Sequence, residues 1–142
     1  MPRSAASDGE STLARWRRRR RSRRVEVFEQ SMAPALQPGD RLLVDPWAYR
    51  ERPPGRGDVV VLRDPESPTR FLVKRVGAVG GEIPPGGTLP LAPGELWLEG
   101  DWGTVSRDSR RFGAVPLAAV LGRAWWRYYP VDRRGPLDDA VP

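Results

Sequence analysis

The chain has 142 residues, 39% hydrophobic and 30% charged, a size and balance that fit a single globular domain with one core. It contains no cysteine and no histidine, which excludes disulfides, a cysteine nucleophile, a Ser-His-Asp triad and the usual zinc sites. The formal charge of +6 is concentrated in residues 1–24, which hold nine arginines against two acidic residues, whereas the remainder has 15 basic and 16 acidic residues.

Residues 1–24 are predicted to form a disordered arginine-rich arm, because Leu13 and Trp16 are their only large apolar residues and cannot build a core. One interpretation is a solvated tail. The other is a peripheral contact with an anionic membrane, with arginines near the lipid phosphates and Trp16 at the interface. Since the remaining chain is close to neutral, nucleic acid is not an expected partner.

Residues 25–130 are predicted to form an all-β domain of short, partly antiparallel strands. The 16 prolines and 15 glycines interrupt the chain too often for long helices. Apolar segments bounded by turn residues predict strands at 25–28, 41–44, 58–62, 71–79, 96–98 and 123–129. Residues 131–142 are charged and contain proline, and are expected to form a flexible tail.

No apolar stretch approaches the roughly 20 residues that a membrane-spanning helix needs. The segment after the arginines is also too short and acidic for the apolar part of an export signal. These features predict a protein that is cytoplasmic or peripheral to a membrane.

Lys74 is the only lysine among 24 basic residues, and the other 23 are arginines. Arginine stays protonated in proteins, whereas a desolvated lysine can lose its proton and act as a base. Strand alternation places Lys74 on the apolar face of Leu72 and Val76, where its pKa should fall. Arg75, on the opposite face, could add repulsion. A lysine retained by chance in an arginine-rich chain is the alternative.

Ser31 follows a predicted strand and precedes a turn that contains Pro34 and Pro38. Considered alone, such a serine is more often a turn or capping residue than a nucleophile. Helix capping is a weak explanation here because the prolines leave little room for a helix.

The order of four short motifs resembles bacterial signal peptidase I across about residues 25–130. The motifs are Ser31-Met32-x-Pro34-x-Leu36 with Gly39-Asp40, Arg56-Gly57-Asp58-Val59-Val60-Val61, Val73-Lys74-Arg75-Val76, and Gly100-Asp101 with Ser106-Arg107-Asp108-Ser109-Arg110 and Phe112-Gly113. Four motifs in one order are much stronger evidence than any single match.

This resemblance implies a serine endopeptidase that uses a Ser/Lys dyad, without metal or cofactor, to remove a leader from a protein substrate. By the family's pattern Ser31 attacks the scissile carbonyl, Lys74 takes its proton, and Ser106 holds the lysine in line. Met32 is expected to be structural, and Asp108 and Arg110 are expected to form a structural ion pair beside the site.

The sequence departs from the family's pattern at several positions. Glu29 stands where relatives commonly have serine or glycine, and a carboxylate there would oppose the developing oxyanion unless it points away. The membrane anchor of typical signal peptidases is missing. Short relatives with an arginine-rich start resemble nickel-type superoxide dismutase maturation proteases, and these residues do not separate that subfamily from an unanchored signal peptidase.

The sequence leaves two other functions open. A non-enzymatic module could bind nucleic acid or an anionic membrane through its arginine-rich arm. An autocleaving repressor domain shares the Ser/Lys chemistry, but the sequence lacks room for a preceding helix-turn-helix and shows no obvious Ala-Gly cleavage site before Ser31. The peptidase is the favoured interpretation.

Overall fold

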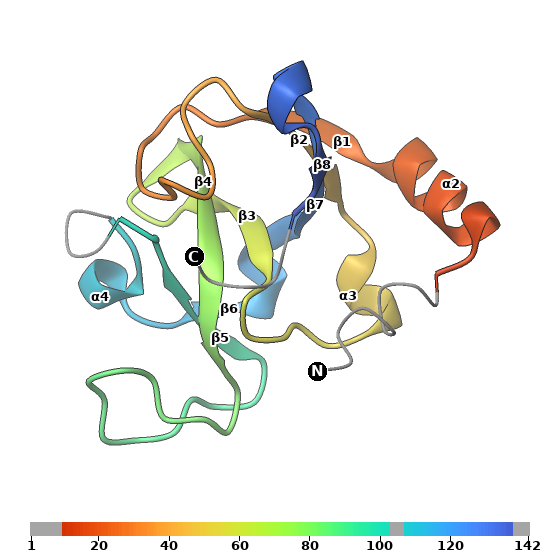
Figure 1. Cartoon of the computed structure of the whole chain (residues 1–142). Coiled ribbons are helices and arrows are strands. Elements are labelled where there is room, and N and C mark those ends of the chain that lie inside the picture. The colour runs from red at the N-terminus through yellow and green to blue at the C-terminus, as the bar shows by residue number, and fades with distance from the viewer. Residues whose placement is uncertain (1–9, 103–106, 138–142) are drawn as a thin grey trace.

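The computed structural model describes residues 10–102 and 107–137, and its main feature is one eight-stranded antiparallel sheet (Figure 1). The strands are β1 (Arg23–Glu26), β2 (Arg41–Asp45), β3 (Val59–Asp64), β4 (Ser67–Val79), β5 (Glu95–Glu99), β6 (Val115–Pro116), β7 (Val120–Tyr129) and β8 (Gly135–Pro136). Their order across the sheet is β1-β2-β7-β3-β4-β5-β6, and β8 also pairs with β7. The predicted all-β fold is therefore confirmed.

The six strands expected from the apolar segments are all present, with boundaries shifted by a few residues. The first expected segment, 25–28, is shifted by two residues toward the amino terminus, since β1 spans Arg23–Glu26. Beyond it, Val27 still bonds across the chain, because its amide donates to the Asp40 carbonyl at 2.8 Å. Backbone hydrogen bonding thus continues beyond the end of β1, toward the segment that holds Ser31.

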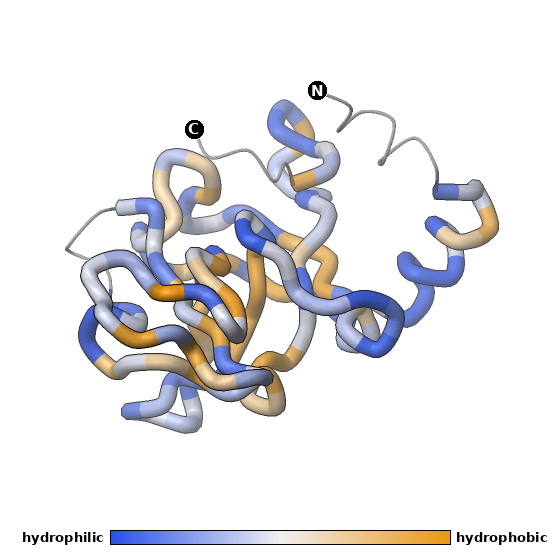
Figure 2. Tube along the Cα trace, turned by 90° about the horizontal axis from the view of Figure 1, so that it is seen from below, coloured by the Kyte–Doolittle hydropathy of each residue, from blue (hydrophilic) through white to orange (hydrophobic). Residues whose placement is uncertain are grey.

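Strand β3 separates two apolar clusters because its successive side chains point to opposite faces of the sheet. Val59 and Val61 belong to a cluster with Met32 and Leu36, whereas Val60 belongs to the other. The second cluster also contains Leu62, Leu72, Val76, Leu96, Leu98 and Val115. Figure 2 shows these hydrophobic segments gathered in the body of the molecule. The continuous run Val59–Leu62 is thereby buried on both sides.

Apart from α2 (Thr12–Arg21), the helices in the described ranges have three or four residues, as the many prolines and glycines predict. They are α3 (Ala48–Glu51), α4 (Ser109–Phe112), η2 (Leu117–Ala119) and η3 (Val131–Arg133). Asp108 caps α4, because its side chain accepts a hydrogen bond from the Arg110 amide. The last motif of the sequence is thus anchored at this helix.

The arginine-rich segment differs from the expected disordered arm, because Thr12–Arg21 form helix α2. Ser11 caps its first turn by accepting from the Ala14 amide at 3.1 Å. The Arg18 guanidinium lies 4.8 Å from the ring centre of Trp125, and Arg21 binds Asp45. Cation–π and ionic contacts therefore hold a helix that has no buried residue.

The carboxyl-terminal boundary also differs from the expected one at residue 130. Strand β8 pairs with β7, and Leu137 packs against the cluster that contains Met32. Arg133 reaches back to the buried Asp40. Residues up to Leu137 are therefore integrated into the domain.

Within the described ranges, no helix is both long and apolar enough to cross a membrane.

Candidate active site

A groove of about 340 Å³ opens beside Ser31. One wall is the segment before and after Ser31, and the other is the first half of β4. The lining residues are Glu26, Val27, Phe28, Glu29, Ser31, Met32, Thr69, Arg70, Phe71 and Val73. The candidate nucleophile thus borders an open space that a substrate segment could enter.

The turn that carries Ser31 is held by backbone hydrogen bonds and by one buried side chain. The Ala33 amide donates to the Gln30 carbonyl and the Leu36 amide to the Met32 carbonyl, both at 2.9 Å. The Trp102 amide donates to the Ser31 carbonyl at 2.9 Å. Met32 is fully buried in the core.

A network of hydrogen bonds and ion pairs around the buried Asp40 carboxylate supports the same turn. Asp40 accepts a hydrogen bond from the Gln37 amide at 3.0 Å. Arg127 of β7 donates from one nitrogen to Asp40 at 3.0 Å and to the Ala35 carbonyl at 2.9 Å, and Arg133 also binds Asp40. The turn is therefore fixed to the centre of the sheet. In the sequence Asp40 stands out only as part of the first motif, and no pattern there points to Arg127.

Lys74 lies in the middle of β4, opposite Val60 of β3, with 0% of its surface exposed. Leu72 and Val76 on the same face are also buried, as strand alternation predicted. The Lys74 ammonium nitrogen makes no hydrogen bond within the described part of the chain, Ser31 included. Its immediate neighbour Val73 lines the groove. Lys74 is therefore a buried residue of the strand that forms one groove wall.

Burial is the largest influence on the Lys74 amine and lowers its pKa from the usual 10.5, because the charged form loses its hydration. The carboxylates of Glu29 and Asp108 oppose this shift, and the Arg110 guanidinium adds to it. The net effect favours the neutral amine, which is the form that can accept a proton. The added cation is Arg110 rather than the expected Arg75.

Arg75 points to the other side of β4 and is fully occupied there. Its guanidinium binds Asp101 at 2.9 to 3.3 Å and donates to the Gly57 carbonyl at 2.9 Å. These contacts join three of the sequence motifs. Arg75 therefore has a structural role beside Lys74.

The expected ion pair between Asp108 and Arg110 is formed at 2.5 Å. Burial alone would raise the pKa of Asp108, but hydrogen bonds from Arg110 and from the Gly100 amide hold it below its usual value. The Gly100 amide lies 2.8 Å from the Asp108 carboxylate. The segment 100–102 thus contacts both the Ser31 turn and the Asp108 pair. Ser106 lies outside the described residues.

Glu29 turns toward Arg70 of β4, and the two side chains form a salt bridge of 3.0 Å. Both residues line the groove. The carboxylate is therefore engaged by a cation on the opposite wall, a partner that the sequence did not reveal.

The described residues contain no group of three or more side chains suited to hold a metal ion.

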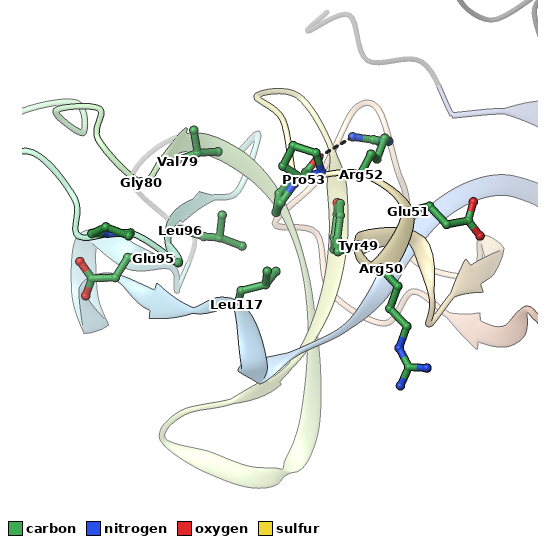
Figure 3. Close-up of a pocket in the computed structure, with 13 residues that line it drawn as sticks. Tyr49, Arg50, Glu51, Arg52, Pro53, Val79, Gly80, Glu95, Leu96 and Leu117 are labelled. Atoms are coloured by element: carbon green, nitrogen blue, oxygen red, sulfur yellow. Dashed lines mark hydrogen bonds between the residues drawn. The ribbon is translucent and has the colours of Figure 1, made fainter.

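A second, larger hollow of about 580 Å³ lies elsewhere, among Tyr49, Pro53, Leu96 and Leu117 (Figure 3). It shares no described lining residue with the groove at Ser31. Since Ser31 lines the smaller groove and Lys74 belongs to the strand that forms one of its walls, we take that groove as the candidate active site.

Comparisons with known proteins identify the family of the chain. The family described as signal peptidase, peptidase S26, matches residues 18–83 and 85–129, which is most of the chain. The chain belongs to the signal peptidase S26 family. It is accordingly a serine-type endopeptidase that removes leader peptides from protein substrates.

Individual relatives of this S26 peptidase come from eukaryotes and from a cyanobacterium. Mitochondrial ATP-independent inner membrane protease subunit 1b of Arabidopsis thaliana is 40% identical, over 78% of this chain and 72% of that protein. Mitochondrial inner membrane protease subunit 2 of Schizosaccharomyces pombe is 36% identical, over 77% and 66% respectively. A Synechocystis protein named probable signal peptidase I-1 is 30% identical, over 78% and 73%.

Proposed function

We propose that Ser31 is the nucleophile of this peptidase and that Lys74 is its general base. Neutral Lys74 accepts the Ser31 hydroxyl proton as the oxygen attacks the scissile carbonyl, and later returns a proton to the leaving amine. Water then hydrolyses the acyl-enzyme by the same route. The products are the leader and the mature protein.

The observation that carries this proposal is the complete burial of the chain's single lysine in the strand that forms the groove wall opposite the Ser31 segment. An uncompensated buried ammonium is unfavourable, so the site favours the neutral base before substrate arrives. The Lys74 ammonium nitrogen makes no hydrogen bond to Ser31 in the structure. In unliganded enzymes such catalytic contacts are often long and tighten only with substrate.

Other residues have supporting parts in the proposal. The Ser31 backbone amide donates to the oxyanion, and Ser106 holds the lysine amine in line, as the family pattern implies. Met32 and the Asp108–Arg110 pair keep the surrounding segments in place. The chemistry requires no metal or cofactor.

The substrate binds as an extended peptide along β4. Strand β4 pairs with β3 on one edge, whereas β5 covers the other edge only from Arg75 to Val79. Thr69, Arg70, Phe71 and Val73 of the uncovered stretch line the groove beside Ser31. Backbone hydrogen bonds from this edge would align the leader for cleavage.

The place of action is proposed to be a membrane surface, where the chain makes a peripheral contact with anionic lipid. Several relatives are named as mitochondrial inner membrane proteases. The basic segment 10–24 supplies the charge for such a contact. Nucleic acid is not a proposed partner, and the non-enzymatic alternative is not favoured by the family match.

The test uses Ser31→Ala and Lys74→Arg with precursor proteins that carry a secretory leader or a nickel-type superoxide dismutase leader. Both variants should lose cleavage by at least a thousandfold, because arginine keeps the charge but cannot act as a base. Arg56→Gln, an exposed change outside the groove, is the control. Cleavage retained by either folded dyad variant rejects the proposed roles.

A further inference from the structure

Helix α2 has a side-chain arrangement that is the reverse of an ordinary surface helix. Its two large apolar residues are exposed, Leu13 by 54% and Trp16 by 52%. The residues of the helix that are partly shielded by the domain are Arg18 and Arg21. A surface helix normally turns its apolar stripe to the core. The apolar stripe of α2 is therefore left for another contact.

The inward face of α2 consists of Arg15, Arg18 and Arg21. These arginines lie on one side of the helix because they are spaced three residues apart. The Arg15 guanidinium lies 5.9 Å from the ring centre of Trp126, and Arg18 lies 4.8 Å from that of Trp125. Arg21 completes the row with bonds of 2.9 and 2.8 Å to Asp45. These contacts fix the orientation of the helix on β2 and β7.

The outward face contains Leu13, Trp16, Arg17 and Arg20, at the i, i+3, i+4 and i+7 positions of one stripe. All four are exposed. The Arg20 guanidinium lies 5.0 Å from the ring centre of Trp16. An aliphatic group, an indole and two fixed cations thus share one surface, on the helix that stands at the edge of the molecule (Figure 1).

We propose that this outward face of α2 docks the protein on an anionic lipid bilayer. Leucine and tryptophan enter the boundary between headgroups and acyl chains, while arginines beside them remain at the phosphates. A bilayer contact uses Leu13 and both cations at once. A nucleic acid would pair with the arginines and stack on Trp16, but Leu13 offers no ring for a base.

This inference deepens the proposed membrane-surface location by naming the docking face and the lipid class. It is independent of the dyad, because no residue of α2 lines the groove at Ser31. The inward arginines fix how the groove is presented to the bilayer. Cleavage of a precursor in solution and binding to vesicles can therefore fail separately.

The experiment measures binding of the full chain to vesicles of phosphatidylcholine alone or with 30% phosphatidylglycerol. Leu13→Ser/Trp16→Ser and Arg17→Gln/Arg20→Gln remove the two components of the face. The matched controls are Leu89→Ser, another exposed leucine, and Arg56→Gln/Arg111→Gln, which removes the same charge from exposed positions on other elements. Thermal denaturation verifies that each variant is folded, and precursor cleavage without vesicles is measured in parallel.

Wild type should bind the anionic vesicles and bind phosphatidylcholine alone at least tenfold more weakly. The Arg17→Gln/Arg20→Gln variant should bind anionic vesicles about 25-fold more weakly than wild type, at roughly fivefold for each cation removed. The Leu13→Ser/Trp16→Ser variant should bind them at least tenfold more weakly. The controls should stay within a few-fold of wild type, and cleavage in solution should not change.

Equal binding to both vesicle types overturns the proposal, and so does wild-type binding by the Leu13→Ser/Trp16→Ser variant. A single-stranded oligonucleotide serves as the competing probe. If the protein binds this oligonucleotide more tightly than the anionic vesicles, and only the Arg17→Gln/Arg20→Gln variant loses that binding, the face is a nucleic-acid site instead.

Discussion

Glu29 and Arg70 form a salt bridge of 3.0 Å between the two walls of the groove at Ser31. The carboxylate stands two residues before the proposed nucleophile, where it would oppose a developing oxyanion. Its engagement by Arg70 reduces that effect. It also acts on the base, because Glu29 is the strongest of the charged groups that raise the pKa of Lys74 against the effect of burial.

Replacement of Glu29 by glutamine should therefore move the pH dependence of cleavage toward acid. The active base is neutral Lys74, so activity rises as pH passes upward through its pKa. Removal of the carboxylate lets burial lower that pKa further, and the rising limb follows it. The measurement is kcat/KM against pH.

Glu26→Gln is the matched control for this change. Glu26 also lines the groove, but it pairs with Arg41 and does not act on the pKa of Lys74. The limb should stay in place in this variant. A limb that moves toward alkali in Glu29→Gln would contradict the electrostatic argument.

Lys74→Met should raise the free energy of unfolding at neutral pH by on the order of 1 kcal/mol or more, although it abolishes cleavage. The folded state lowers the pKa of this lysine, so the unfolded chain binds the proton more readily between the folded value and 10.5. Wild-type stability therefore rises with pH across that window. Urea unfolding at several pH values measures both chains.

The advantage of Lys74→Met should shrink as pH rises toward 10.5 and above it, because only above the unfolded pKa is the amine neutral in both states. Loss of stability in the methionine variant at neutral pH would mean that the buried ammonium is compensated by contacts. The Ser31→Ala variant, with its pH dependence unchanged, separates this effect from loss of activity.

Arg127→Met should lower kcat about tenfold beyond any effect on folding, because it releases the carbonyl of Ala35 in the turn that carries Ser31. Arg127 is a positioning residue in this argument. Arg133→Met is the comparison, since it removes another cation from Asp40 without a bond to Ala35. Both variants should destabilise the domain by about 1–3 kcal/mol.

Separate measurement of kcat and KM tests the positioning role of Arg127. If Arg127→Met and Arg133→Met reduce kcat equally at a temperature where both are folded, the Ala35 bond has no positioning effect.

Gly122→Ala should destabilise the fold by about 1–3 kcal/mol, since a methyl group there would stand 2.7 Å from the Asp45 carbonyl oxygen. This contact lies where β7 passes β2, so the backbone must shift. Gly55→Ala is the control, because nothing lies within 4 Å of the added atom. Thermal unfolding of the two variants should differ clearly, and equal midpoints would contradict the close approach.

Several parts of the fold followed from local pattern alone. The run Val59–Leu62 and the alternation around Lys74 predicted buried strands, because side-chain direction in a strand depends only on sequence position. The burial of Lys74 and its lowered pKa follow from the same rule. The order of the motifs identified the family, which the comparisons then confirmed.

Helix α2 was predicted wrongly as disordered, because its stability comes from Trp125 and Asp45, which are distant in sequence. Composition cannot show that arginines will stack on such partners.

The sequence by itself determined which residue types were available for chemistry: one lysine, no histidine and no cysteine. Tertiary structure alone decided the electrostatic setting of that chemistry, through the contacts of Glu29 with Arg70 and of Arg127 with Asp40. The physical reason is that charge–charge interactions depend on distance and burial in space, and residues about 40 and 90 positions apart acquire both only when the sheet forms.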